Sequence, residues 1–243
     1  RSRGLGDVYK RQMMYGFIYE GTYKYEDFDK VGDTYTLKRN VPYFSSESNT
    51  QPGMPKYADL NGDGIIDDND RTMIGNGMPK HTGGFTNNFE YKGFDLSIFF
   101  QWSYGNDVLN ANRLFFENSN KTRDLNQYAS YADRWTPENP ESNIPRATDS
   151  GSNKVFSTRI IEDGSFLRLK TVSLGYTLPK QLTKKWKIDN ARVFVAGQNL
   201  WTCTGYSGYD PEVSIREGAL TPGLDFSAYP RAYSISFGIN LGF

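Results

Sequence analysis

The clearest pattern in the chain is a strict alternation of apolar and polar residues over its last segment, YSISFGINLGF. A period of two is typical of a β-strand with one apolar and one polar face. A membrane-spanning strand has this alternation over about 9 to 11 residues. A soluble edge strand alternates too. For a membrane strand we predict that Tyr233, Ile235, Phe237, Ile239 and Leu241 face lipid and that Ser234, Ser236, Gly238 and Asn240 face the lumen of a barrel. The apolar row consists of Tyr233, Ile235, Phe237, Ile239, Leu241 and Phe243.

Similar alternation occurs in earlier segments of the chain. Residues 81–104 predict a hairpin that turns at 91–93, and residues 165–178 and 190–202 predict two further strands. Within 165–178, the cleaner apolar row is Val172, Leu174, Tyr176 and Leu178. Within 190–202, alternation places Leu200 on one face and the following residues on the other: Val193, Val195, Gly197, Asn199 and Trp201.

The connections between these predicted strands alternate in length: short, long, short, long. Outer-membrane barrels have short periplasmic turns and longer extracellular loops. This order therefore predicts an antiparallel transmembrane barrel whose C-terminus is periplasmic. The longest connection, 105–156, is polar and predicts a helix that ends before Pro137 and Pro140.

Composition narrows the class of protein. Hydrophobic residues make up 37% of the 243 residues and aromatic residues 15%, which suits a barrel with aromatic girdles but also a soluble glycan-binding β-domain. The formal charges balance at 28 basic and 28 acidic residues, without a long basic run, so nucleic acid is not an expected partner. One cysteine and one histidine exclude an internal disulfide and a His-rich zinc site.

One stretch, DLNGDGIIDDND, has the spacing of an EF-hand-type calcium loop. Gly64 stands at loop position 6, where a sharp turn is needed, and position 12 is an aspartate instead of the usual glutamate. We predict a Ca²⁺ site in an extracellular loop; the alternative is a solvated acidic turn. The predicted ligands, at positions 1, 3, 5, 7, 9 and 12, are Asp59, Asn61, Asp63, Ile65, Asp67 and Asp70.

The sequence offers little that supports catalysis. The glycine-rich stretch GNGMPKHTGG lacks the Gly-Lys-Ser/Thr of a phosphate loop, and no Ser/His/Asp set can be built around the lone His81. A glycosidase pair is defined by the separation of two carboxyl groups in space, which spacing along the chain does not give. We predict that the protein is not an enzyme.

Several segments, in one order along the chain, resemble the C-terminal end of the SusC/RagA-type TonB-dependent outer-membrane transporters of Bacteroidetes. They are YADLNGDGIIDDNDRTMIGN, GGFTNNFEYKGFDLSIFFQWSYGND, DRWTPENPESNIPRA, EDGSFLRLKTVSLGYTLPK, VFVAGQNLWTCTGYSGYDPE and TPGLDFSAYPRAYSISFGINLGF. The resemblance runs from Met13 to Phe243. Residues 1–12 share no pattern with the rest and are interpreted as a candidate non-native leader.

The resemblance implies an all-β fold, a barrel of about 22 strands when complete with a plugged lumen. It also implies a SusD-like surface lipoprotein as partner and energy supplied through the TonB complex by a missing N-terminal part. A last strand ending in an aromatic residue resembles the signal bound by the outer-membrane assembly machinery, although a strand can also end in phenylalanine without such a role.

On this basis we expect residues 13–80 to form an extracellular loop region and residues 81–243 to form barrel strands and loops. The predicted function of the parent protein is nutrient import, of glycans or of peptides. The alternative is a secreted, calcium-stabilised β-sandwich that binds carbohydrate through exposed tyrosine and tryptophan. A surface glycosidase is a third hypothesis. The sequence does not identify the substrate or the residues that bind it.

Overall fold

A computed structural model of the chain describes residues 13–118, 126–148, 155–212 and 223–243. The chain forms two compact units, each assembled from segments that are far apart in the sequence. Unit 1 contains residues 1–77, 107–162 and 214–228, and unit 2 contains residues 78–106, 163–213 and 229–243. Strands dominate both units, which confirms the predicted all-β class.

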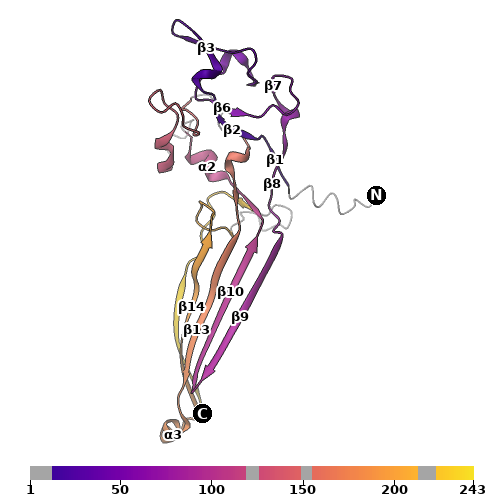
Figure 1. Cartoon of the computed structure of the whole chain (residues 1–243). Coiled ribbons are helices and arrows are strands. Elements are labelled where there is room, and N and C mark those ends of the chain that lie inside the picture. The colour runs from indigo at the N-terminus through magenta and orange to yellow at the C-terminus, as the bar shows by residue number, and fades with distance from the viewer. Residues whose placement is uncertain (1–12, 119–125, 149–154, 213–222) are drawn as a thin grey trace, which may run out of the picture. The chain divides into compact units, whose positions relative to one another are not determined.

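Unit 2 is built on one five-stranded antiparallel sheet, whose strands are the long arrows that lie side by side in Figure 1. Every strand pairs with its neighbours along the chain, in the order β16-β14-β13-β10-β9. The strands are β9 (His81–Tyr91), β10 (Phe94–Tyr104), β13 (Phe166–Thr177), β14 (Asn190–Thr204) and β16 (Ser234–Gly242). The predicted hairpin and the three later strands are therefore confirmed, with their alternating short and long connections.

The two short connections lie at the same end of the sheet. Strands β9 and β10 are joined by Lys92 and Gly93, both at positive φ, a conformation that glycine adopts without steric cost. Strands β13 and β14 are joined by α3 (Lys180–Thr183) and η6 (Lys184–Trp186). The C-terminus lies at this end too, because the Asp189 amide donates to the Gly242 carbonyl at 2.8 Å.

The register of the sheet separates apolar from polar residues onto opposite faces. One row across all five strands is entirely apolar: Phe89, Leu96, Leu174, Val195 and Phe237. The adjacent row, one residue along each strand, points to the other face: Asn88, Ser97, Ser173, Ala196 and Ser236. The alternation read from the C-terminal segment thus extends across the whole sheet.

Gly175 allows an ion pair to form across the polar face. Arg192 on β14 pairs with Asp95 on β10, and the two residues meet over the intervening strand β13. A Cβ at position 175 would overlap both the guanidinium and the carboxylate. Glycine is therefore required here by the close approach of two side chains.

A β-bulge in β13 corrects one detail of the predicted faces. Lys170 has no partner in either neighbouring strand. Leu167 and Leu169 therefore lie on the same face as Val172, although strict alternation would place these odd-numbered residues opposite an even-numbered one. The opposing strand adapts at Asn199, which has positive φ, and the Leu200 side chain lies over Gly197. The prediction that Leu200 lies on the opposite face from Gly197 was wrong, because the bulge interrupts the period of two.

Unit 1 consists of short strand pairs with small aromatic cores. The antiparallel pairs are β1 (Met13–Gly16) with β8 (Thr72–Asn76), β2 (Tyr19–Thr22) with β6 (Pro55–Tyr57), and β3 (Phe28–Val31) with β4 (Thr34–Leu37). Strands β5 (Tyr43–Phe44) and β7 (Ile65–Ile66) pair in parallel, and a last sheet has the order β12 (Ile161–Asp163), β11 (Asp107–Asn110), β15 (Leu224–Asp225). Phe17, Tyr57 and Ile66 form one core, and Tyr23, Phe28 and Leu37 another.

Helical segments in unit 1 are short. They are α2 (Ala111–Phe116) and the 3-10 turns η1 (Tyr25–Asp27), η2 (Glu47–Asn49), η3 (Asp68–Asp70), η4 (Ala129–Asp133) and η5 (Thr158–Ile160). The helix predicted before Pro137 corresponds to η4, which ends directly before Arg134 and is a single 3-10 segment. Among the described residues, none of the helices has the length and apolar character needed to cross a membrane.

Candidate functional site

The first candidate site is the apolar face of the unit 2 sheet. Its side chains are large and exposed, with Phe237 81% and Ile239 68% accessible. In water such a surface would be costly, because each square ångström of exposed apolar area contributes about 25 cal/mol when it is buried. Monomeric soluble proteins rarely leave a contiguous apolar patch of this kind uncovered. The geometry therefore favours a face that is covered by an apolar medium or partner.

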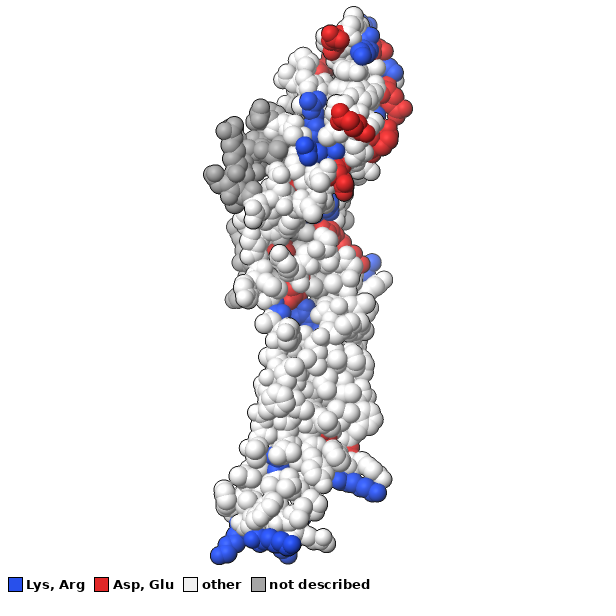
Figure 2. All heavy atoms as spheres, turned by 90° about the vertical axis from the view of Figure 1, so that its left-hand side faces the viewer, with Lys and Arg blue, Asp and Glu red and all other residues white. Residues whose placement is uncertain are grey.

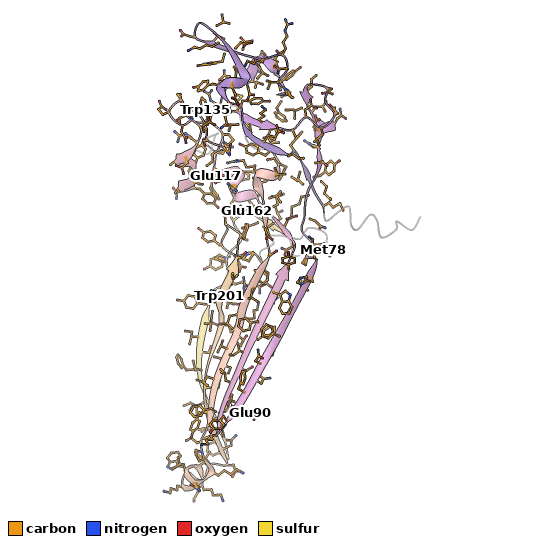
Figure 3. The ribbon with its side chains drawn as sticks, viewed as in Figure 1. Met78, Glu90, Glu117, Trp135, Glu162 and Trp201 are labelled. Carbon is orange, nitrogen blue, oxygen red and sulfur yellow. The ribbon has the colours of Figure 1, made fainter. Side chains whose placement is uncertain are left out.

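Aromatic residues mark both ends of this face. At the end with the short turns, the rings of Phe94 and Tyr176 lie 4.5 Å apart, centroid to centroid. Toward the other end, the rings of Trp102 and Phe85 lie 6.2 Å apart, centroid to centroid, and Phe85 also stacks on Phe100. Figure 3 shows Glu90 and Trp201 toward these two opposite ends of the sheet. Aromatic residues at both ends of an apolar face are typical of strands that cross a bilayer.

The terminal strand presents the predicted assembly residues along one edge of this sheet. Tyr233, Ile235, Phe237, Ile239, Leu241 and Phe243 are all more than half exposed. Strand β16 pairs only with β14, so its outer edge has unpaired backbone groups within the described residues. The structure is compatible with the predicted recognition role, which stays a prediction.

The second candidate site is the acidic loop from Asp59 to Asp70. Asp59 accepts hydrogen bonds from the amides of Gly62 and Gly64 at 2.7 and 2.8 Å. Asp70 is fully buried and accepts from the amides of Leu60 and Asp67, both at 2.8 Å. Burial alone raises the pKa of Asp70, but these hydrogen bonds outweigh it and hold the pKa below its ordinary value.

The predicted ligands of this loop are brought together only in part. Asn61 and Asp63 are hydrogen-bonded to each other, at 2.9 Å from Nδ2 to Oδ2. Asp67 accepts from the Asn69 amide at 2.7 Å as the cap of η3. Within the described part of the chain, no three His, Cys, Asp or Glu side chains are grouped as a metal centre. The hard oxygens suit Ca²⁺ by chemistry, and the calcium site stays a prediction.

Sequence reasoning missed a buried ion cluster on the polar face of unit 2, centred on Arg168. Its guanidinium pairs with Asp210 and with Glu212, the latter at 3.0 Å, and only 3% of the side chain is accessible. Lys170 and Arg231 also pair with Glu212, at 3.5 and 3.1 Å. The signal in the sequence was an arginine between two leucines in a strand, which places the charge on the opposite face from the leucines.

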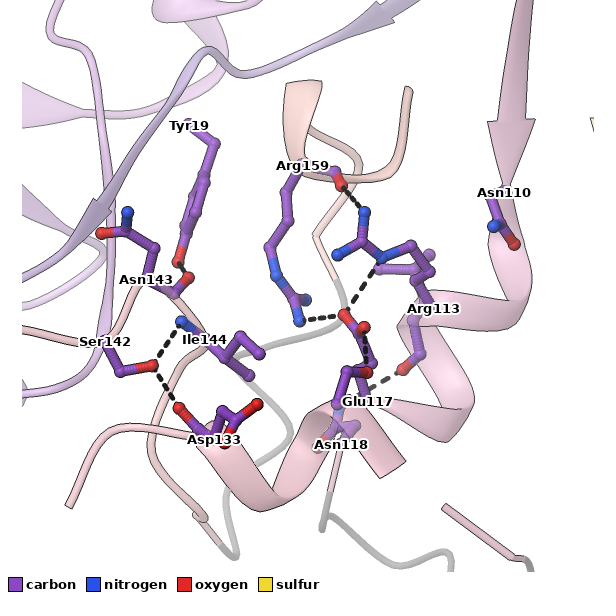
Figure 4. Close-up of polar contacts among 12 residues, drawn as sticks. Tyr19, Asn110, Arg113, Glu117, Asn118, Asp133, Ser142, Asn143, Ile144 and Arg159 are labelled. Carbon is purple, nitrogen blue, oxygen red and sulfur yellow. Dashed lines mark hydrogen bonds and ion pairs between the residues drawn. The ribbon is translucent and has the colours of Figure 1, made fainter. Parts of the chain in front are cut away.

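A second buried cluster lies in unit 1 and joins α2 to the segment before β12. Glu117 accepts from Arg159 at 2.7 Å, from Arg113 at 3.1 Å and from Ser130 at 2.7 Å (Figure 4). Asn110 also donates to Glu162 at 3.0 Å. Every oxygen of the Glu117 carboxylate is thus engaged, so this cluster orders the fold of unit 1 and offers no open position to a ligand.

The sheet geometry defines a class of protein: one with a membrane β-sheet that has an apolar face suited to lipid and a polar face on the other side. No protein-family model matches the chain. TonB-dependent receptor P3 of Formosa agariphila is 35% identical over 236 residues, covering 94% of this chain and 22% of that protein. Receptor P26 of the same organism is 39% identical over 79% of the chain and 20% of that protein. SusC of Bacteroides thetaiotaomicron, also named a TonB-dependent receptor, is 28% identical over 81% and 18%.

The chain is also similar to solved structures of transporters. The RagAB peptide transporter matches with a TM-score of 0.70 and 26% identity, over 95% of this chain and 23% of that chain. The chain therefore belongs to the TonB-dependent receptors and spans about a fifth of the length of the curated relatives that it matches. These relatives are named receptors and transporters, which confirms the prediction that the chain does not belong to an enzyme.

Proposed function

We propose that the chain supplies C-terminal strands and loops to the barrel of a SusC/RagA-type outer-membrane importer. The observation that carries the proposal is the row Phe89, Leu96, Leu174, Val195 and Phe237, which keeps the sheet apolar from edge to edge on one face. In a barrel this face would meet lipid, and the polar face would line the lumen. The short turns and the C-terminus would be periplasmic.

Nutrient uptake is the proposed activity of the full-length receptor. One similar structure is named a peptide transporter, which supports peptides as cargo, and glycans are the other class considered. A SusD-like surface lipoprotein would be the partner and TonB the energy source. Two experiments test the proposal. Affinity purification of the full-length receptor from detergent-solubilised outer membranes tests for the lipoprotein partner. Separate uptake assays with peptides and with oligosaccharides test the cargo. Recovery of the receptor as a soluble periplasmic or secreted protein would refute the proposal and favour the carbohydrate-binding β-sandwich.

Calcium is the proposed ligand of the Asp59–Asp70 loop. Asp59, Asn61, Asp63 and Asp70 would hold it through side-chain oxygens and Ile65 through its carbonyl, with Asp67 acting through water. Millimolar extracellular calcium would fill even a weak site of about 10⁻⁴ to 10⁻³ M. The loop is anchored to the unit 1 core through Ile66, which is 1% exposed. Calcium would therefore order this segment without being needed for the barrel.

Substitution of the proposed calcium ligands should have graded effects. Asp59→Ala or Asp63→Ala should abolish binding, because each removes a core oxygen ligand and leaves too few. Asp67→Ala should have a smaller effect. Asp68→Ala is the matched control, since Asp68 is exposed and pairs with Arg71 at 3.1 Å. Isothermal calorimetry on the full-length receptor measures the ranking, and equal losses from Asp63→Ala and Asp68→Ala would exclude the site.

The last residue should matter more for assembly than for stability. Deletion of Phe243, or Phe243→Asp, should lower the amount of receptor in the outer membrane while leaving the stability of the folded barrel nearly unchanged. Phe243 is 87% exposed and lies beyond the last ladder pair, so little packing is lost. Quantitative blotting of outer-membrane fractions, combined with heat-modifiable migration, measures both quantities. Normal membrane levels of both variants would argue against a recognition role.

A further inference from the structure

The turn between β13 and β14 carries a concentrated positive charge. Its four lysines, which we call the basic turn, are Lys180, Lys184, Lys185 and Lys187. All four are exposed, and none forms an ion pair with any residue that the structure describes. The only acidic residue of the segment is Asp189. Figure 2 shows basic side chains gathered at the end of unit 2 that carries α3, below a stretch of strands with very few charges.

Two large apolar side chains are exposed among these lysines. Trp186 is 61% accessible and Leu182 is 45% accessible. Their exposure is imposed by a folded turn: the Leu182 amide donates to the Pro179 carbonyl at 2.9 Å, and the Ile188 amide donates to Thr183 at 3.1 Å. Thr183 is itself buried. The turn therefore holds lysines, tryptophan and leucine outward together.

The basic turn stands at the rim of the apolar face. Its two ends are fastened to the sheet, with the Leu178 amide donating to Ala191 at 2.9 Å and the Asp189 amide donating to Gly242 at 2.8 Å. The aromatic band of Phe94 and Tyr176 belongs to the same end of the sheet. An apolar face, an aromatic band and a cluster of lysines thus follow one another along the strands, as depth in a bilayer changes from hydrocarbon to headgroup.

We propose that the basic turn binds the headgroups of anionic phospholipids in the leaflet at this end of the barrel. Each lysine near an anionic leaflet contributes about a factor of five in affinity. Trp186 and Leu182 would insert at the headgroup boundary, where tryptophan is favoured and basic side chains extend toward phosphate. An acidic protein partner would explain the lysines, but it would not explain the exposed tryptophan and leucine beside the apolar face of the sheet. This inference rests on the proposed membrane location.

The test uses the full-length receptor in nanodiscs of phosphatidylcholine alone or with phosphatidylglycerol. Hydrogen exchange of amides 180–190 is the readout. We expect phosphatidylglycerol to slow exchange in the unmodified receptor, and we expect Lys184→Gln/Lys185→Gln/Lys187→Gln to lose this slowing. The control is Lys30→Gln/Arg39→Gln, two exposed basic residues of unit 1, which should keep it. Soluble inorganic phosphate should not reproduce it.

Three outcomes would overturn the inference: exchange that does not depend on phosphatidylglycerol, equal loss in the control variant, or the same slowing by inorganic phosphate. Slowing by an added periplasmic protein and not by lipid would assign the basic turn to a protein partner, which also contradicts the proposal. Heat-modifiable migration of each variant in the nanodisc is measured alongside. A receptor that migrates as a folded barrel but shows no lipid dependence refutes the basic turn alone, whereas failure to enter the bilayer would refute the proposed function.

Discussion

Arginine in place of Phe237 should destabilise the folded barrel by about 2 to 4 kcal/mol, because a lipid-facing arginine near the bilayer midplane must be buried in hydrocarbon. Phe237 stands in the middle of β16 and pairs with Val195 in the apolar row. The free energy of unfolding is measured by urea titration of the full-length receptor in lipid vesicles. Loss of a large side chain contributes too, so Phe237→Ala is measured to subtract that part.

Ser236→Arg is the matched control for this prediction. Ser236 is the preceding residue of the same strand, pairs with Ala196 and points to the polar face. An arginine there would face water in the lumen, and we expect little change in the free energy of unfolding. Equal destabilisation at positions 236 and 237 would show that the two faces have been assigned incorrectly.

Removal of the Arg168 guanidinium should strongly destabilise unit 2. Arg168→Ala leaves the carboxylates of Asp210 and Glu212 without their buried partner, and breaking such a pair typically costs about 3 to 5 kcal/mol. The loss should be concentrated in the segment after β14, which the pair fastens to the polar face. Hydrogen exchange of residues 205–212 measures this local loss, and Lys170→Ala, at the rim of the same cluster, is the milder control.

The same cluster should respond to acid. Burial raises the pKa of Asp210, but hydrogen bonds from Arg168 and from the amides of Glu212 and Arg231 outweigh it, so the pKa lies below its ordinary value. A carboxyl group with a lowered pKa stabilises the folded state above about pH 4 and loses this contribution as pH falls through the lowered pKa. Protection of residues 205–212 should therefore persist at pH 5 and decline below pH 4. Protection unchanged in Arg168→Ala, or lost already at pH 6, would contradict this account.

The strands were predictable because a period of two is a local signal. Each strand of unit 2 alternates along its own length, and the hairpin at Lys92 and Gly93 is marked by a turn residue that tolerates positive φ. In the sequence, the bulge at Lys170 was visible only as a shift of the apolar positions from odd-numbered residues, ending at Leu169, to even-numbered residues, beginning at Val172. Without the partner strands this change could not be distinguished from two separate patterns, so Leu200 was assigned to the wrong face.

The ion clusters and unit 1 were less predictable for a different physical reason. Arg168 meets Asp210 across 42 positions of sequence, and Glu117 meets Arg159 across a similar distance. Such pairs are decided by the fold and leave no periodic trace. The short strand pairs of unit 1 contain as few as two residues each, for example β5 with β7, which is below the length at which alternation can be recognised. The acidic loop was found because its ligand spacing is local.

Site-directed spin labelling of β16 tests the central claim most directly. Single cysteines at positions 234 to 241 of the full-length receptor, with the exposed Cys203 replaced by serine, are labelled with a nitroxide in lipid vesicles. We predict that collision with oxygen, which concentrates in lipid, peaks at 235, 237, 239 and 241, while collision with a water-soluble nickel complex peaks at 234, 236, 238 and 240. Accessibility to the nickel complex that is equal on both sets of positions would contradict a lipid-facing strand.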